Sequence, residues 1–129
     1  MHEASLVSGL LGTALAEVEK YNAALPAGAS PVLAIRGLTL DVGLIACVEE
    51  QTLKACFELM AEDTIAAGAK LTVQRLPLPC ECRSCGKHFM LTQRHFVCPS
   101  CGGKDMAFNG GQGCTLSKLD VEVEENNHG

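Results

Sequence analysis

The stretch CRSCGKHFMLTQRHFVCPSCGGKD, residues 82–105, contains two Cys-x-x-Cys pairs, Cys82 with Cys85 and Cys98 with Cys101, and twelve residues separate the pairs. A Cys-x-x-Cys turn lets both thiolates face one point, and the glycine after each pair relieves crowding where the backbone turns toward sulfur. Two such turns complete a tetrahedron of sulfur ligands. The spacing therefore predicts a Zn²⁺ site that is structural, because four thiolates leave no coordination position open.

Metal binding is expected to fold this segment, because a segment so short has almost no hydrophobic core of its own. In zinc-finger peptides that binding amounts to about 10–16 kcal/mol of apparent free energy. Two alternatives fit the same cysteines. Iron suits a four-thiolate frame of similar spacing, as in rubredoxin, and redox-active cysteine pairs would need no metal at all.

The remaining cysteines and the two histidines of the segment are weaker ligand candidates. Four cysteines lie outside the pairs: Cys47, Cys56, Cys80 and Cys114. We expect the first two to be small core residues, because they fall on apolar stretches, and the last two to be spare or buried thiols. His88 and His95 could approach a metal if the site rearranged, but solvent exposure is the favoured interpretation for both.

The rest of the chain reads as alternating helices and strands. Apolar residues recur every four positions over residues 5–21, and a stripe of apolar residues also marks 48–63, so both stretches are predicted helices. Residues 32–46 read as a strand. Alternation of apolar and polar residues predicts two more strands: one of about seven residues within AKLTVQRLP at 69–77, stopped by Pro77 and Pro79, and one at 115–125.

This order predicts an α+β fold, in which two helices cover one face of a three-stranded sheet and a zinc-ribbon-like module with four cysteine ligands is inserted. The first domain is expected to span residues 1–78 and to be completed by the strand at 115–125. The zinc-binding domain is expected to span residues 79–114.

Composition and charge limit the classes of function that the chain can have. The chain has 129 residues, of which 47% are hydrophobic and 19% charged, enough for one modest core and a small appended module. A net charge of −5 repels the negatively charged phosphate backbone of nucleic acids, so we expect no nucleic-acid partner.

Localisation follows from what the chain lacks. No apolar run reaches the roughly 18 residues of a membrane span, and the start lacks an export signal, so we expect a cytoplasmic protein with reduced thiols. The sequence shows no nucleophile paired with a base, so we do not expect an enzyme.

The first residues, MHEASL, offer a second metal site. The amine of Met1, the backbone nitrogen of His2 and the His2 ring nitrogen Nδ1 can close two chelate rings in one plane. The backbone nitrogen or the carboxylate of Glu3 could supply a fourth donor. A planar, nitrogen-rich set favours Ni²⁺ or Cu²⁺ over Zn²⁺. The alternative is that His2 is simply a polar residue at the end of the chain.

Four motifs together resemble the HypA/HybF nickel-incorporation family of hydrogenase maturation: MHEASL at residues 1–6, TIAAGAKL at 64–71, the two Cys-x-x-Cys pairs, and LDVEVE at 119–124. The resemblance spans nearly the whole chain. One departure is GLIACV at residues 43–48, where the family usually has a turn close to Gly-Glu-Leu-Ser-Gly-Val. Leu44 therefore replaces the family's acidic residue.

The resemblance implies a nickel metallochaperone for [NiFe]-hydrogenase maturation, with Ni(II) as cargo held at Met1, His2 and Glu3. It implies structural Zn(II) at four residues: Cys82, Cys85, Cys98 and Cys101. Partners would be a HypB-type GTPase and a hydrogenase large-subunit precursor, with urease proteins as a target in some organisms, and a homodimer is conceivable. Two other functions stay open: a zinc-ribbon protein-interaction module without a nickel role, and an iron electron-transfer protein.

Overall fold

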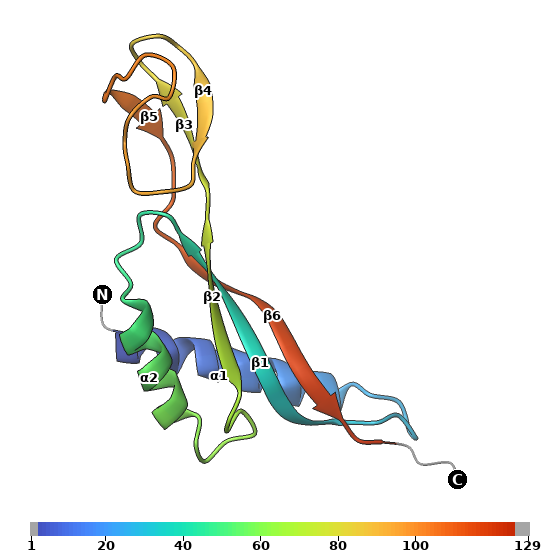
Figure 1. Ribbon diagram of the computed structural model, residues 1–129. Coiled ribbons are helices and arrows are strands. Elements are labelled where there is room, and N and C mark those ends of the chain that lie inside the picture. The colour runs from blue at the N-terminus through green and yellow to red at the C-terminus, as the bar shows by residue number, and fades with distance from the viewer. Residues whose placement is uncertain (1–2, 126–129) are drawn as a thin grey trace. The chain divides into compact units, whose positions relative to one another are not determined.

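The computed structural model describes residues 3–125 and contains two helices and two three-stranded sheets (Figure 1). The helices are α1 (Glu3–Ala23) and α2 (Glu50–Met60). The first sheet has the order β2-β1-β6 and the second the order β4-β3-β5. Their strands are β1 (Val32–Gly43), β2 (Lys70–Leu76), β3 (Leu78–Cys82), β4 (His88–Leu91), β5 (Met106–Phe108) and β6 (Cys114–Val123). The predicted α+β class is confirmed. Within residues 3–125 there is no helix of the length and apolar character that a membrane crossing requires.

The described chain divides into two compact units. The first comprises residues 3–40, 48–72 and 116–125, and the second comprises residues 41–47 and 73–115. Strands β1, β2 and β6 each contribute residues to both units.

The core of the first unit is built from both helices and from β1. Helix α1 buries one stripe of its surface because its apolar residues recur at helical spacing. The members of that stripe are Val7, Leu10, Leu11, Ala14 and Val18. Helix α2 contacts α1 and buries Leu53 and Phe57, while Ile35, Leu38 and Leu40 of β1 are at most 1% exposed. Cys56 of α2 is half-buried and is not among the buried core residues.

The start of α2 is fixed by Glu49, which precedes the helix in an extended conformation. Its carboxylate accepts hydrogen bonds from the backbone N–H groups of Gln51 (3.2 Å) and Thr52 (2.6 Å), which have no partner inside the helix. The backbone N–H of Glu49 itself donates to the carboxylate of Glu3 at 3.1 Å. Glu3 is thereby held at the N-terminus of α2.

The second unit has a small core of its own beneath the sheet β4-β3-β5. Alternate residues of β3 are buried, so Leu78, Cys80 and Cys82 face inward while Pro79 and Glu81 are exposed. Leu44 and Leu91 complete the buried cluster. Four half-buried apolar side chains pack against it: Ile45, Phe89, Phe96 and Met106.

Residues 41–47 belong to the second unit, and two arginines hold them there. Arg94 donates from Nε to the carbonyl of Leu44 (2.8 Å) and from Nη2 to the carbonyl of Ala46 (2.6 Å). Arg75 donates from Nη1 to the carbonyls of Gly43 (3.2 Å) and Ala46 (3.0 Å). Strand β1 ends at Gly43, whereas the sequence predicted that it would continue to residue 46. The expectation that Cys47 is a core residue is wrong, since its side chain is exposed.

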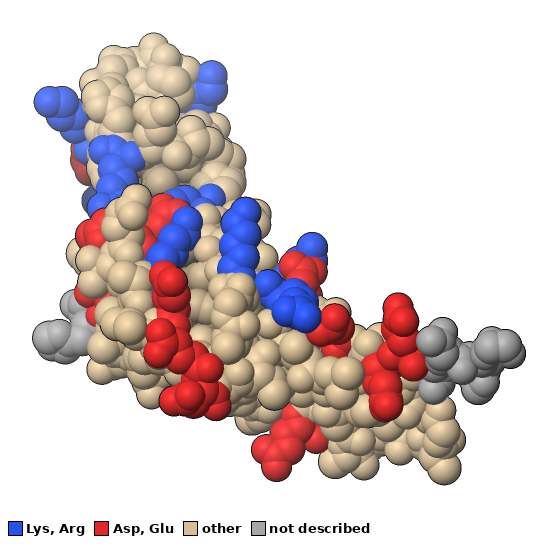
Figure 2. All heavy atoms as spheres, turned by 60° about the horizontal axis from the view of Figure 1, so that its bottom comes forward, with Lys and Arg blue, Asp and Glu red and all other residues tan. Residues whose placement is uncertain are grey.

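The two units differ in charge. The fifteen acidic residues divide into twelve in the first unit and three in the second, and the ten Lys and Arg into five and five. The first unit therefore carries −7 and the second +2, which together give the net −5 of the chain. In the view of Figure 2, Asp and Glu side chains are spread over much of the surface of the first unit.

Candidate metal centre

The four paired cysteines form one cluster in the second unit. The Sγ atoms of Cys82, Cys85, Cys98 and Cys101 all lie within 4.8 Å of one another. The Sγ atoms of Cys82 and Cys101 are 3.6 Å apart, and those of Cys85 and Cys98 are 3.7 Å apart. A Zn–S bond of about 2.3 Å places the sulfur atoms of a tetrahedral site about 3.8 Å apart. The donor set and its spacing therefore fit a tetrahedral thiolate-bound dication such as Zn²⁺.

Each pair sits in a turn of the same geometry. The N–H of the glycine after the pair donates to the carbonyl of the first cysteine, Gly86 to Cys82 at 2.8 Å and Gly102 to Cys98 at 2.9 Å. Both glycines have positive φ, 77° and 74°, a conformation that costs a residue with a side chain about 1–2 kcal/mol. Strand β3 ends at Cys82 and so anchors the first turn to the sheet. These glycines therefore allow the backbone to curl around the sulfur cluster.

At neutral pH the cluster is not fully ionised without a bound cation. The pKa of Cys98 falls to about 6, chiefly because the backbone N–H of Cys101 donates to its sulfur. The N–H of Gly103 also lowers the pKa of Cys101, but hydrogen bonding to Cys82, burial, and hydrogen bonding to Cys98 and Cys85 outweigh it and raise that pKa to about 11. Adjacent thiols thus ionise at different pH values, because a second negative charge beside the first is unfavourable. A bound dication would remove that penalty.

The other thiols do not join the cluster. Cys80 is buried and its Sγ donates to the carbonyl of Leu78 at 3.5 Å, and burial raises the pKa of the Cys80 thiol. Cys114 is half-buried, and burial raises its pKa as well. His88, on β4, and His95, in the loop that follows β4, are both exposed.

Of the three residues expected to bind nickel, Met1 and His2 lie outside the described residues. Glu3 is the first described residue, and its hydrogen bond from the N–H of Glu49 is the main reason that the pKa of its carboxyl is lowered. Its carboxylate is therefore ionised at neutral pH. Sequence reasoning placed Glu49 at the start of a helix but did not identify it as the partner of Glu3, because nothing in the local sequence pattern indicates a contact between residues 46 positions apart.

The α+β first unit, together with a second unit built around four converging thiols, defines a small metal-binding protein. The model of one protein family, described as "Hydrogenase/urease nickel incorporation, metallochaperone, hypA", matches residues 1–121. The chain therefore belongs to the HypA family.

Two relatives agree with this assignment, and one solved structure shares the fold. Hydrogenase maturation factor HypA 2 of Bradyrhizobium diazoefficiens is 33% identical over 122 residues, which cover 95% of this chain and all of the relative. Hydrogenase maturation factor HypA of Dehalococcoides mccartyi strain CBDB1 is 34% identical over 124 residues, 96% of this chain and 97% of the relative. The solution structure of the Ni metallochaperone HypA from Helicobacter pylori shares the fold, with a TM-score of 0.60 at 21% identity over 96% of this chain and all of that one.

Proposed function

We propose that this chain binds Ni(II) at Met1, His2 and Glu3 and delivers it during [NiFe]-hydrogenase maturation in the cytoplasm. The observation that carries the proposal is the match to the nickel-incorporation family over residues 1–121, combined with the Met-His-Glu start. Two partners follow from this role: a HypB-type GTPase and a hydrogenase large-subunit precursor.

The chemistry of the terminus supports a site suited to delivery. Nitrogen donors from Met1 and His2 favour Ni²⁺ or Cu²⁺ over Zn²⁺. The ionised Glu3 carboxylate, anchored by the N–H of Glu49 at 3.1 Å, adds negative charge beside these donors. Ligands at the end of a chain can be exchanged one at a time, which suits transfer of the cargo to another protein.

The four-cysteine cluster plays a different role in this proposal. Its sulfur atoms would hold Zn(II) in a closed site that folds the second unit and leaves no position for cargo. The two metals would therefore occupy separate sites with different donor atoms.

Nickel binding to the zinc-loaded chain tests the proposal. Replacing His2→Ala removes the imidazole from the chelate, so we expect loss of tight nickel binding with zinc content unchanged by metal analysis. One extra residue ahead of Met1 should have the same effect, because it moves the amine out of the chelate ring. The variant His95→Gln, which changes an exposed histidine elsewhere, should bind nickel as the native chain does.

The same measurements distinguish the alternative, a zinc-ribbon interaction module without a nickel role. If native, His2→Ala and extended chains bind nickel equally, the N-terminal site does not exist and this alternative is favoured. An iron protein would be recognised by its colour and by iron in place of zinc.

A further inference from the structure

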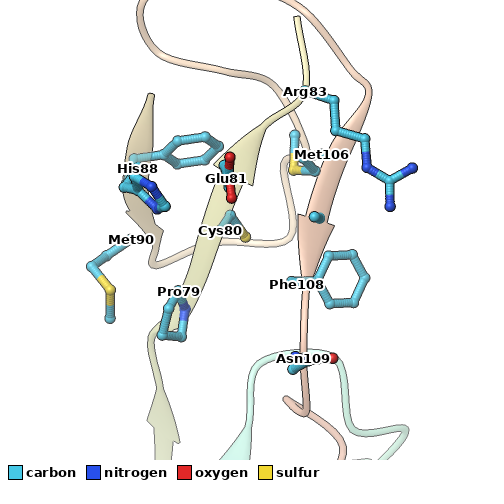
Figure 3. A pocket seen from close by; sticks show the side chains of 11 residues that line it. Pro79, Cys80, Glu81, Arg83, His88, Met90, Met106, Phe108 and Asn109 are labelled. Carbon is cyan, nitrogen blue, oxygen red and sulfur yellow. The ribbon is translucent and has the colours of Figure 1, made fainter. Parts of the chain in front are cut away.

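The outer face of the sheet β4-β3-β5 carries two potential metal ligands that the proposed function does not use. The register pairs Glu81 of β3 directly with His88 of β4 and, on its other side, with Ala107 of β5. Glu81 and His88 are both exposed, and both line a shallow pocket on this face. Figure 3 shows their side chains next to each other on one side of the sheet.

Neither side chain has another role in the described structure. Within residues 3–125, no hydrogen bond or ion pair engages the side chain of Glu81 or of His88. A nearby cation, Arg83, pairs with Asp105 at 3.8 Å, and in Figure 3 its guanidinium is directed away from Glu81. The carboxylate and the imidazole are therefore both available to a ligand in the pocket.

The spacing of the pair suits chelation of one metal ion. Directly opposed residues of an antiparallel pair have Cβ atoms about 4.5–5.5 Å apart. Carboxylate oxygens and imidazole nitrogens bind transition metals at about 2.0–2.2 Å, so side chains of this length can meet at a shared ion. Ala107, on the far side of Glu81, is small and leaves room for water on the remaining coordination positions.

We propose that Glu81 and His88 form a low-affinity site for a divalent transition metal of the nickel and copper class, completed by water. One imidazole and one carboxylate suit these borderline ions better than soft monovalent ones. The site is separate from the sulfur cluster, because Cys82 points to the buried face of β3 while Glu81 points to the exposed face. It includes none of Met1, His2 and Glu3, so it does not depend on the proposed nickel delivery.

Nuclear magnetic resonance of the zinc-loaded His2→Ala chain, titrated with Ni²⁺ alone, tests this site. That background removes the imidazole of the N-terminal chelate. Because hydrated Ni²⁺ is paramagnetic, we expect the ring signals of His88 and the side-chain signals of Glu81 to broaden together, at lower nickel concentration than those of His95. Glu81→Gln should weaken nickel binding at His88 by about tenfold, and His88→Gln should abolish the broadening at Glu81.

Two matched controls lie in the same unit. His95→Gln removes the other exposed histidine, and Met90→Leu removes an exposed thioether two residues from His88 whose side chain points away from Glu81 in Figure 3. Neither should change broadening at His88. The proposal is overturned if His88 and His95 broaden at the same nickel concentration, if Glu81→Gln has no effect, or if nickel enters only the four-cysteine cluster. Each of these results leaves the capture of nickel by the native terminus, measured separately, unaffected.

Discussion

At the scale of single residues, the protonation of the four clustered cysteines decides how the metal centre behaves. Cys98 is largely ionised at neutral pH because its pKa is about 6. Cys85 and Cys101 are protonated there, because the pKa of Cys85 is raised above its usual value and that of Cys101 reaches about 11. A metal must therefore displace protons from some of its ligands but not from all of them.

We predict that zinc binding at pH 7 releases at least two protons and fewer than four. The protons come from Cys85 and Cys101, which are thiols before binding and thiolates after it, whereas Cys98 has none to lose. Calorimetric titration in buffers of different ionisation enthalpy measures this number. Since protons compete with zinc, affinity should fall as pH falls, and release should diminish as pH rises through the pKa values of the free thiols. A proton release independent of pH between 6 and 10 would contradict this account.

Sequence reasoning identified the residues of this cluster because the Cys-x-x-Cys spacing reports directly on local turn geometry. It did not identify the partners of Glu3. The hydrogen bond between Glu3 and Glu49 joins residues 46 positions apart, and such a contact depends on how α1 and α2 meet. The exposed position of Cys47 was missed for a similar reason, because an apolar stretch does not reveal where a strand ends.

At the scale of structural elements, the end of β1 is set by close backbone packing. The N–H of Gly43 donates to the carbonyl of Gly113 at 2.8 Å, and that of Ile45 donates to the carbonyl of Gly111 at 2.9 Å. A Cβ atom on Gly43 would overlap the backbone of Gly111. The sequence predicted a strand here, but a local pattern could not predict this approach of two backbones.

We predict that Gly43→Ala destabilises the second unit by about 1–3 kcal/mol or more, the cost of forcing extra volume into a packed site. The overlap is with backbone atoms, which cannot move aside as a flexible side chain can. Denaturant unfolding of the zinc-loaded chain, followed by signals from the second unit, measures the change.

Gly9→Ala is the matched control for this substitution. Gly9 lies in the interior of α1, and a Cβ atom there would meet nothing within 4 Å. Because alanine restricts the unfolded chain and favours helix, we expect no loss and a gain of up to about 1 kcal/mol. Equal effects of the two substitutions would mean that the packing at Gly43 has no special importance.

At the scale of the whole molecule, the two units rest on different sources of stability. The first buries aliphatic and aromatic side chains from two helices and a sheet, including Phe57, Ile35 and Leu38. The second has only a small buried cluster around Leu78, beside the four thiols. The sequence predicted this contrast, because a segment as short as the cysteine-rich one has almost no hydrophobic core of its own. They did not predict that residues 41–47 belong to the second unit, which depends on the arginine contacts to their carbonyls.

We predict that removing the bound metal with a chelator disorders the second unit and spares the first. The four thiols lose the cation that holds them together, whereas the described core around Phe57 is made of apolar side chains. Amide hydrogen exchange should accelerate in β3, β4 and β5 and stay slow in the middle of α1. Adding zinc back should restore protection. Uniform loss of protection along the chain would show that both units depend on the metal.

The attachment of Leu44 to the second unit has a consequence for building chimaeras from HypA relatives. A cassette cut at residues 73 and 115 and moved into another family member would leave behind Leu44, which is 4% exposed and packs with Leu78, Cys80 and Leu91. It would also separate Arg94 from the carbonyl groups that it binds. A transplant that carries residues 41–47 along with the cassette keeps both sets of contacts, so recombination of this protein requires two donor segments rather than one.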